Sequence, residues 1–170
     1  MLIDGQDIEM QHPLCYGKIY DKWLVSKCGK VWSIKNNRIL KGAITYNYNK
    51  NGRGKKALEI ILSISTPIGF WEGSSLGLYQ HVGLVNTESR TIRKHRLIMD
   101  TWKPLYDNPP EDVSWETWEQ IRDYPDNFKF YNESVVIDHI DNNPLNNHIN
   151  NLRRITTVAN DKHRKKVGLK

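Results

Sequence analysis

The sequence has little cysteine, no long apolar run and no internal repeat. Its cysteines, Cys15 and Cys28, do not have the spacing of a zinc-ribbon pair, so we expect two reduced thiols and no structural zinc. No stretch approaches the roughly 18 apolar residues that a membrane span needs. The first ten residues, MLIDGQDIEM, are acidic and lack the apolar centre of a signal peptide. These absences predict a soluble, intracellular protein with no membrane partner.

Acidic residues are also scarce in two parts of the chain. Residues 17–56 hold eleven Lys or Arg and a single acid, a net charge of +10. Residues 151–170 carry +6, whereas residues 105–150 carry −8. Solvated surface faces could account for such blocks. Two basic segments around an acidic centre favour a nucleic-acid partner.

The first half of the chain has the pattern of short β-strands. We expect residues 1–16 to form an irregular leader. The segment WLVSKCGKVWSIKNNRIL, residues 23–40, predicts strands joined by turns at KCGK and KNNR, where Gly and Asn tolerate positive φ. Further strands are expected at residues 57–64 and 81–86, with a basic turn before the first and a loop between them. Together these segments predict a small antiparallel sheet with basic turns.

The second half alternates helices and connections. The segment TIRKHRLIMDTWKP, residues 91–104, predicts a helix that Pro104 ends. Residues 105–113 read as a connection. A second helix is expected over residues 114–124, with Ser114 as its N-cap and Trp118 in the core. Pro125 is expected to close it.

An Asn-rich stretch, VVIDHIDNNPLNNHINNLRRITTVAND, occupies residues 135–161. Its start predicts a strand that ends at Asp138 and His139. A loop and a second strand, NLRRIT, follow, and a helix is expected after a cap at Thr156 or Thr157. Asn and Asp stabilise loops through side-chain hydrogen bonds to nearby backbone. A plain loop would not need an Asp-His pair at the end of a strand.

KHRLIMDTW and the stretch from Val135 to Asn160 resemble the HNH endonucleases with a ββα-metal site, and most of all the HNH homing endonucleases of phages and introns. The family has an HRL segment, then DHIDGN, NLR and EN. YDKWLVSKCGKVWSIKNNRILKG, in the first half, is similar to the small β module that precedes the nuclease domain. The resemblance implies an α+β fold. A basic antiparallel β module that binds DNA would occupy residues 17–90. An HNH ββα-metal nuclease domain would occupy residues 91–170, with an insertion at about 105–134. Asn142 stands where the family often has Gly, and Asn also adopts the left-handed conformation.

The resemblance also implies the roles of the site residues. His139 would be the general base, since imidazole titrates near neutral pH. Asp138 and Asn160 would bind Mg²⁺, Mn²⁺ or another divalent cation through oxygen, and no small-molecule cofactor is implied. Asn151 would orient His139 by hydrogen-bonding in the loop and fixing its ring. His95 would lie beside the site as a further catalytic residue, with packing or a DNA contact as the alternative.

Other polar residues of this region have supporting roles. His163 is an alternative metal ligand, because it follows Asn160 on nearly the same helix face. Four residues are expected to hold the loop together: Asp141, Asn143, Asn146 and Asn147. Two sets of basic residues are candidates for contact with DNA. The set that would neutralise phosphates is Arg153, Arg154, Lys162, Arg164 and Lys165. The set in the basic turns, which would contact a groove, is Lys27, Lys30, Lys35, Arg38, Arg53, Lys55 and Lys56.

The sequence thus predicts a metal-dependent DNA endonuclease, of the homing type by resemblance, in a bacterial or phage-infected cytoplasm. Its partner would be double-stranded DNA, and we expect a monomer rather than a homodimer. A less specific phage or restriction HNH nuclease is one alternative. A catalytically silent DNA-binding protein is another. An RNA-binding module is a third, since Trp23, Trp32, Tyr46 and Tyr48 stand among lysines. The choice between a nick and a double-strand break stays open.

Overall fold

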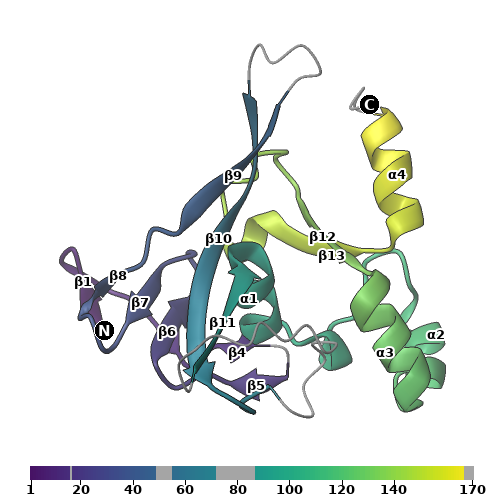
Figure 1. The fold of residues 1–170 in the computed structure, drawn as a ribbon. Helices are drawn as coiled ribbons and strands as arrows, with labels where there is room; N and C mark the ends of the chain where they lie inside the picture. Colours follow the sequence, from purple (N-terminus) through teal and green to yellow (C-terminus); the bar gives the residue numbers. More distant parts are fainter. Residues whose placement is uncertain (16, 49–54, 72–86, 167–170) are drawn as a thin grey trace.

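The computed structural model describes the 170-residue chain except residues 16, 49–54, 72–86 and 167–170. Small antiparallel sheets and α-helices make up the fold, which confirms the expected α+β class (Figure 1). The strands are β1 (Leu2–Ile3), β2 (Gln6–Asp7), β3 (Met10–Gln11), β4 (Leu14–Cys15), β5 (Lys18–Ile19), β6 (Trp23–Ser26), β7 (Val31–Ser33), β8 (Arg38–Ile39), β9 (Ala43–Tyr48), β10 (Lys55–Pro67), β11 (Thr87–Arg93), β12 (Val136–His139) and β13 (Leu152–Ile155). The helices are α1 (Lys94–Trp102), α2 (Trp115–Ile121), α3 (Pro125–Ser134) and α4 (Thr157–Lys166), with 3₁₀ turns η1 (Leu105–Asp107) and η2 (Ile149–Asn151).

The N-terminal segment is more regular than the irregular leader expected. Strands β1 and β2 form a hairpin through Asp4 and Gly5, which have φ of 52° and 77°. An Asp-Gly pair at positive φ is the usual two-residue hairpin turn. Strand β3 then adds to β6, at the edge of a sheet ordered β3-β6-β7-β8. The expected strands and turns of residues 23–40 are confirmed in this sheet, with Gly29 and Asn37 at positive φ in its turns.

A second sheet is built around the long strand β10. This strand pairs with β9 over residues 55–61 and with β11 over residues 61–67. The hairpin of β9 and β10 extends away from the rest of the molecule, toward the same side as α4 (Figure 1). The expected strand at 57–64 is confirmed and is longer, while the one at 81–86 lies outside the described residues. Residues 91–93 belong to β11, not to the helix predicted from Thr91.

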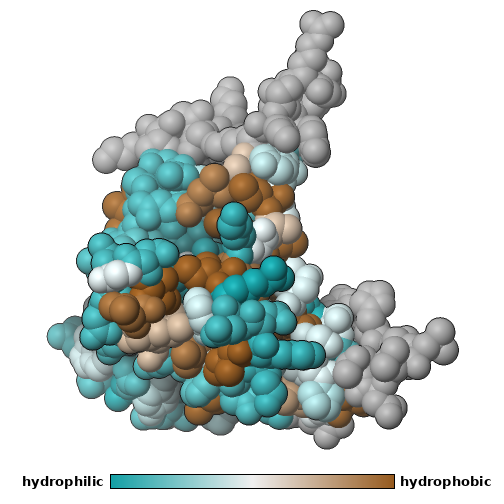
Figure 2. All heavy atoms as spheres, turned by 90° about the vertical axis from the view of Figure 1, so that its left-hand side faces the viewer, coloured by the Kyte–Doolittle hydropathy of each residue, from teal (hydrophilic) through white to brown (hydrophobic). Residues whose placement is uncertain are grey.

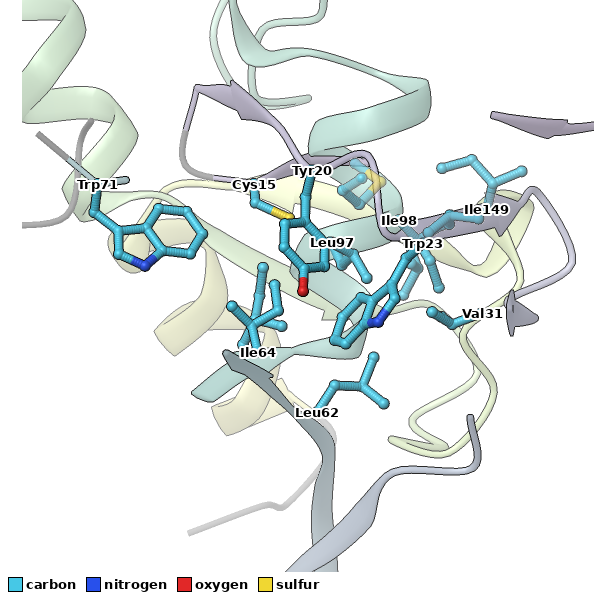
Figure 3. Packing of buried hydrophobic residues seen from close by; sticks show 14 residues of the cluster. Cys15, Tyr20, Trp23, Val31, Leu62, Ile64, Trp71, Leu97, Ile98 and Ile149 are labelled. Atoms are coloured by element: carbon cyan, nitrogen blue, oxygen red, sulfur yellow. The ribbon is translucent and has the colours of Figure 1, made fainter. Parts of the chain in front are cut away.

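One hydrophobic cluster joins the N-terminal strands to the C-terminal half of the chain. Trp23 and Val31 of the first sheet pack in the same cluster as Leu97 and Ile98 of α1 and Leu152 of β13 (Figure 3). Helix α1 contacts β4, β6, β10, β11, β12 and β13. The helix lies at the centre of the fold because its aliphatic side chains are buried on several sides.

The segment of residues 105–134 belongs to a second, smaller hydrophobic core. Trp118, which is fully buried, packs with Leu105 and Val135. Ser114 caps α2 as expected, since its side chain accepts a hydrogen bond from the Thr117 amide. Pro125, expected to close that helix, instead begins α3, because proline fits the first turn of a helix.

The side of the molecule formed by the N-terminal strands has a mixed surface. Hydrophilic areas alternate there with hydrophobic patches (Figure 2). Leu2 on β1 and Ile44 on β9 are among the exposed apolar residues. Cys15 is buried and Cys28 exposed, and both are free thiols as expected. No helix in the described part of the chain is long and apolar enough to cross a membrane.

Candidate active site

Strands β12 and β13 and helix α4 form the compact unit predicted for residues 135–166. The two strands pair antiparallel, with Asp138 opposite Arg153 and His139 opposite Leu152. Thr156 begins the helix, since its hydroxyl accepts a hydrogen bond from the Ala159 amide at 3.2 Å. Helix α4 contacts β12, the strand that carries Asp138 and His139. The expected order of strand, loop, strand and helix is therefore confirmed.

Asp141 is the centre of the loop between the strands. Its carboxylate accepts hydrogen bonds from the Asn143 amide at 2.8 Å and from the side chains of Asn146 and Asn151 at 2.8 and 2.9 Å. These bonds, that of Asn146 above all, lower the pKa of Asp141. Asn142 takes a φ of 58°, the left-handed conformation expected where the family often has Gly. The loop is thus held by its own side chains.

The side chain that hydrogen-bonds to the His139 ring is that of Asn147. Ring Nε2 of His139 lies 3.2 Å from Oδ1 of Asn147, and both residues are buried. Asn151 bonds instead to Asp141 and to the Asn146 carbonyl. Asn151 thus hydrogen-bonds within the loop as predicted, and no hydrogen bond joins it directly to His139 among the described residues. Asn151 fixes the loop, and Asn147, expected only to stabilise the loop, bonds to the histidine.

The hydrogen bonds of the Asn147 side-chain amide indicate which ring nitrogen of His139 carries the hydrogen. Its nitrogen donates to the Leu145 carbonyl at 3.2 Å, so its oxygen faces the imidazole. An amide oxygen accepts a hydrogen bond, so Nε2 of His139 carries the hydrogen and Nδ1 keeps the lone pair. No described residue hydrogen-bonds to this Nδ1. His139 thus presents one ring nitrogen as a base.

His95 lies directly beside His139. The two rings meet edge to face, with centroids 5.4 Å apart and an angle of 79° between their planes. Burial above all, together with the charges of His139, Arg93 and Arg96, lowers the pKa of His95 to about 3. Its Nδ1 is buried and has no hydrogen-bond partner among the described residues. His95 is therefore a neutral neighbour of His139 at neutral pH.

Asp138 is engaged in an ion pair on one side. Arg153 donates to its Oδ2 from Nε at 2.9 Å and from Nη2 at 2.7 Å. No described residue hydrogen-bonds to its Oδ1. Asn160, the other expected ligand, is half-buried on α4. A carboxylate and an amide oxygen suit a hard cation such as Mg²⁺, which keeps several waters.

Among the described residues, no three His, Cys, Asp or Glu side chains gather as they would around a metal held by the protein alone. The alternative ligand, His163, is half-buried on α4, and its Nε2 is buried with no hydrogen-bond partner in the described part of the chain. His163 therefore stays a candidate beside Asn160.

Arg154 must be removed from the candidates for DNA contact. Only 3% of this residue is exposed, and its guanidinium pairs with Asp100 at 2.7 Å and donates to the Lys103 carbonyl. Burial lowers its pKa, which the charge of Asp100 opposes. The prediction for Arg154 is wrong because alternate side chains of β13 point to opposite faces, and this one points inward.

The other basic candidates differ in their surroundings. Lys27 pairs with Glu9 at 2.8 Å and lies over the Trp102 ring, and Lys30 pairs with Asp4 at 3.2 Å. Lys35, Arg38 and Lys162 are exposed. Arg38 and Lys41 border a shallow depression of about 630 Å³ between β8, β9 and β10. Arg53 lies outside the described residues, as do the side chains of Lys55, Lys56, Arg164 and Lys165.

Comparisons with known proteins add one finding. No family model matches the chain, and no curated protein matches it. A solved structure described as "DNA binding and cleavage by the HNH homing endonuclease I-HmuI" is similar to it, with a TM-score of 0.48 and 19% sequence identity. The match covers 96% of this chain and 61% of I-HmuI, so the chain spans about three fifths of that protein's length. A likeness at this level assigns neither activity nor partner to the chain.

Proposed function

We propose that this chain is a metal-dependent DNA endonuclease of the HNH type, which hydrolyses phosphodiester bonds. One observation carries the proposal: His139 follows Asp138 at the end of β12, with Nε2 bonded to Asn147 and Nδ1 without a described partner. A histidine fixed in this way, next to a carboxylate, has the arrangement of a general base beside a cation site. The motifs that resemble the HNH family lie on these same residues.

His139 would act through its free ring nitrogen. Nδ1 would take a proton from a water molecule, and the water oxygen would form a bond to phosphorus as the bond to the leaving oxygen breaks. Asn147 would keep Nε2 protonated and stop the ring from rotating. A neutral His95 does not repel a protonated His139 ring, whereas a cation at this position would.

Asp138 and Asn160 would hold the divalent ion. When bound, Mg²⁺ or Mn²⁺ would stabilise negative charge on the phosphate and on the leaving oxygen. Arg153, which pairs with Asp138, would need to share that carboxylate or leave it. The exposed Lys35, Arg38 and Lys162 would neutralise phosphates of the duplex.

The test is cleavage of supercoiled plasmid with Mg²⁺ or with EDTA, comparing the intact chain with His139→Ala. His12→Ala, which removes an exposed histidine of the N-terminal segment, is the matched control. Loss of a general base should slow cleavage roughly 10²–10⁴-fold, while DNA binding in a gel shift stays the same. Cleavage in EDTA, or equal rates for His139→Ala and His12→Ala, would contradict the proposal.

The ion pair of Asp138 with Arg153 favours a second candidate, a catalytically silent DNA-binding protein that keeps the fold. In such a protein Arg153 would permanently replace the cation beside Asp138. Duplex binding without cleavage, on plasmid and on DNA from around the gene itself, would support this candidate.

The homing type is the finer form of the proposal and is supported by the resemblance in motifs. A homing enzyme would cut one site, near its own gene, far faster than other sites. Cleavage of a plasmid that carries this flanking DNA, compared with one that does not, would test it. Equal rates on both plasmids would favour the less specific HNH nuclease.

A further inference from the structure

We infer that the turn between β6 and β7, residues 26–30, positions His139 by holding Asn147 in place. The inference rests on the proposed function, since it gives this turn a part in the reaction of His139. It makes Gly29 a positioning residue that acts through Asn147, about 120 positions along the chain and in the other half of the fold.

Gly29 touches the backbone of Asn147. It is buried with a φ of 84°, and a Cβ at this position would lie 2.9 Å from the Asn147 carbonyl oxygen and 3.2 Å from its carbonyl carbon. Contacts this short are repulsive, so only glycine fits here without a shift of Asn147 or of the turn. The turn therefore limits where the Asn147 backbone can lie.

A hydrogen bond joins the same two segments. The Ile149 amide donates to the Lys27 carbonyl at 2.8 Å. Ile149 also packs in the main hydrophobic cluster with Val25 and Val31, which flank the turn (Figure 3). Asn147 is thus held by the contact with Gly29 and, two residues later, by this bond.

The turn itself is rigid. Ser26 is fully buried, and its hydroxyl accepts a hydrogen bond from the Lys30 amide at 2.9 Å. The Ser26 amide donates to the Lys30 carbonyl at 3.0 Å, and the Gly29 amide to the Ser26 carbonyl at 3.2 Å. A turn closed by these bonds can act as a fixed support for the loop above it.

The side chain of Asn147 links this turn to His139. Asn147 is 4% exposed and bonds to His139 at 3.2 Å, which is already the long end of a good hydrogen bond. A shift of Asn147 by a few tenths of an ångström would break this bond and free the imidazole to rotate. Lys27 and Lys30 lie in the same turn. The turn therefore links two candidates for contact with DNA to His139, the proposed general base.

The first test compares Gly29→Ala with Gly17→Ala. Gly17 has nearly the same φ, 85°, but a Cβ there meets nothing within 4 Å, so this variant reproduces the backbone strain without the contact. With both proteins shown to be folded by thermal unfolding, Gly29→Ala should lower kcat for plasmid cleavage roughly 10–100-fold with KM nearly unchanged. Gly17→Ala should keep the intact kcat. Equal kcat values for the two variants would overturn the inference.

The second test does not depend on activity. Ring ¹⁵N signals of His139 report which nitrogen carries the hydrogen. Asn147→Leu should remove the preference for the Nε2–H form, and Asn147→Asp, which keeps an acceptor oxygen, should restore it. Gly29→Ala should resemble Asn147→Leu, while Gly17→Ala should resemble the intact chain.

The two tests separate the inference from the proposed function. If the intact chain cuts no DNA but the His139 signals change in Gly29→Ala, the proposed function fails and the positioning holds. If Gly29→Ala leaves the His139 signals unchanged, the positioning is overturned whatever the activity.

Discussion

Arg153 donates two hydrogen bonds to a single oxygen of Asp138, and the two residues face each other across β12 and β13. Their side chains are only 22% and 15% exposed, so water screens this pair less than a surface pair. A divalent cation bound to Asp138 would stand close to the Arg153 charge, and like charges repel. The pair would therefore weaken the metal binding that we propose for Asp138.

Replacing Arg153 should strengthen metal binding. Arg153→Gln removes the competing cation, and we expect the Kd for Mn²⁺ in the absence of DNA to fall about tenfold, which is the effect of roughly 1.4 kcal/mol of charge repulsion. Titration calorimetry measures it, with Arg38→Gln on β8 as the control for loss of one arginine. An unchanged Kd in Arg153→Gln would show that Arg153 does not compete with the ion for Asp138.

His95 should make the protein less stable in acid. Its pKa is lowered to about 3 in the folded chain, so below pH 6.5 the unfolded chain binds a proton that the folded chain does not. Stability is then lost as the pH falls through 6.5 and toward 3, by about 2 kcal/mol between pH 7 and pH 5. Urea unfolding of His95→Phe at both pH values should show a loss smaller by about this amount. An identical loss in both proteins would contradict the low pKa.

Arg154 should matter for stability and not for DNA binding. Arg154→Ala removes the shorter of the two ion pairs of Asp100 and leaves only the one with Arg96 at 3.3 Å, so the free energy of unfolding should drop by about 3 kcal/mol. Lys162→Ala, which removes an exposed charge from the next element, should change it by less than about 0.5 kcal/mol. Denaturant unfolding measures both. Equal effects would place the Arg154 side chain on the surface.

Salt should weaken DNA binding steeply. If about six phosphates are neutralised, the slope of log K against log salt is near −5. Lys35→Gln and Arg38→Gln, which remove exposed charges without an ion pair among the described residues, should each make the slope shallower by about 0.9. Lys129→Gln, on the exposed face of α3, is the matched control and should leave the slope unchanged. A flat salt response in the intact chain would rule out extended phosphate contact.

The strands and helix around His139 could be predicted because their signals are local. A β-branched run, an Asn-rich loop and a Thr cap are each contained in a few neighbouring residues. The Asp4–Gly5 pair is an equally local signal of a hairpin, but an irregular leader was predicted there. Helix α3 was missed because Pro125 was taken only as the end of a helix, although proline begins helices as well.

The partner of His139 could not be predicted from the loop sequence. Several asparagines follow the histidine, and which of them faces the ring depends on the path of the loop. That path is set by Gly29 and by the bond from Ile149 to Lys27, both far away in the sequence. Arg153 and Arg154 were treated alike for a similar reason, because only the fold decides which face of β13 is buried.

The single cluster that unites Trp23 with Leu97 and Leu152 has an evolutionary consequence. Parts of a protein that fold separately can be exchanged between genes by recombination. In this protein, an N-terminal half from another gene would lack the side chains that pack against α1 and β13. Its turn between β6 and β7 would also not fit the loop that carries Asn147. Variation in this lineage is therefore expected to proceed by point substitution within the joined halves, and by gain or loss of segments such as 105–134 whose core is separate.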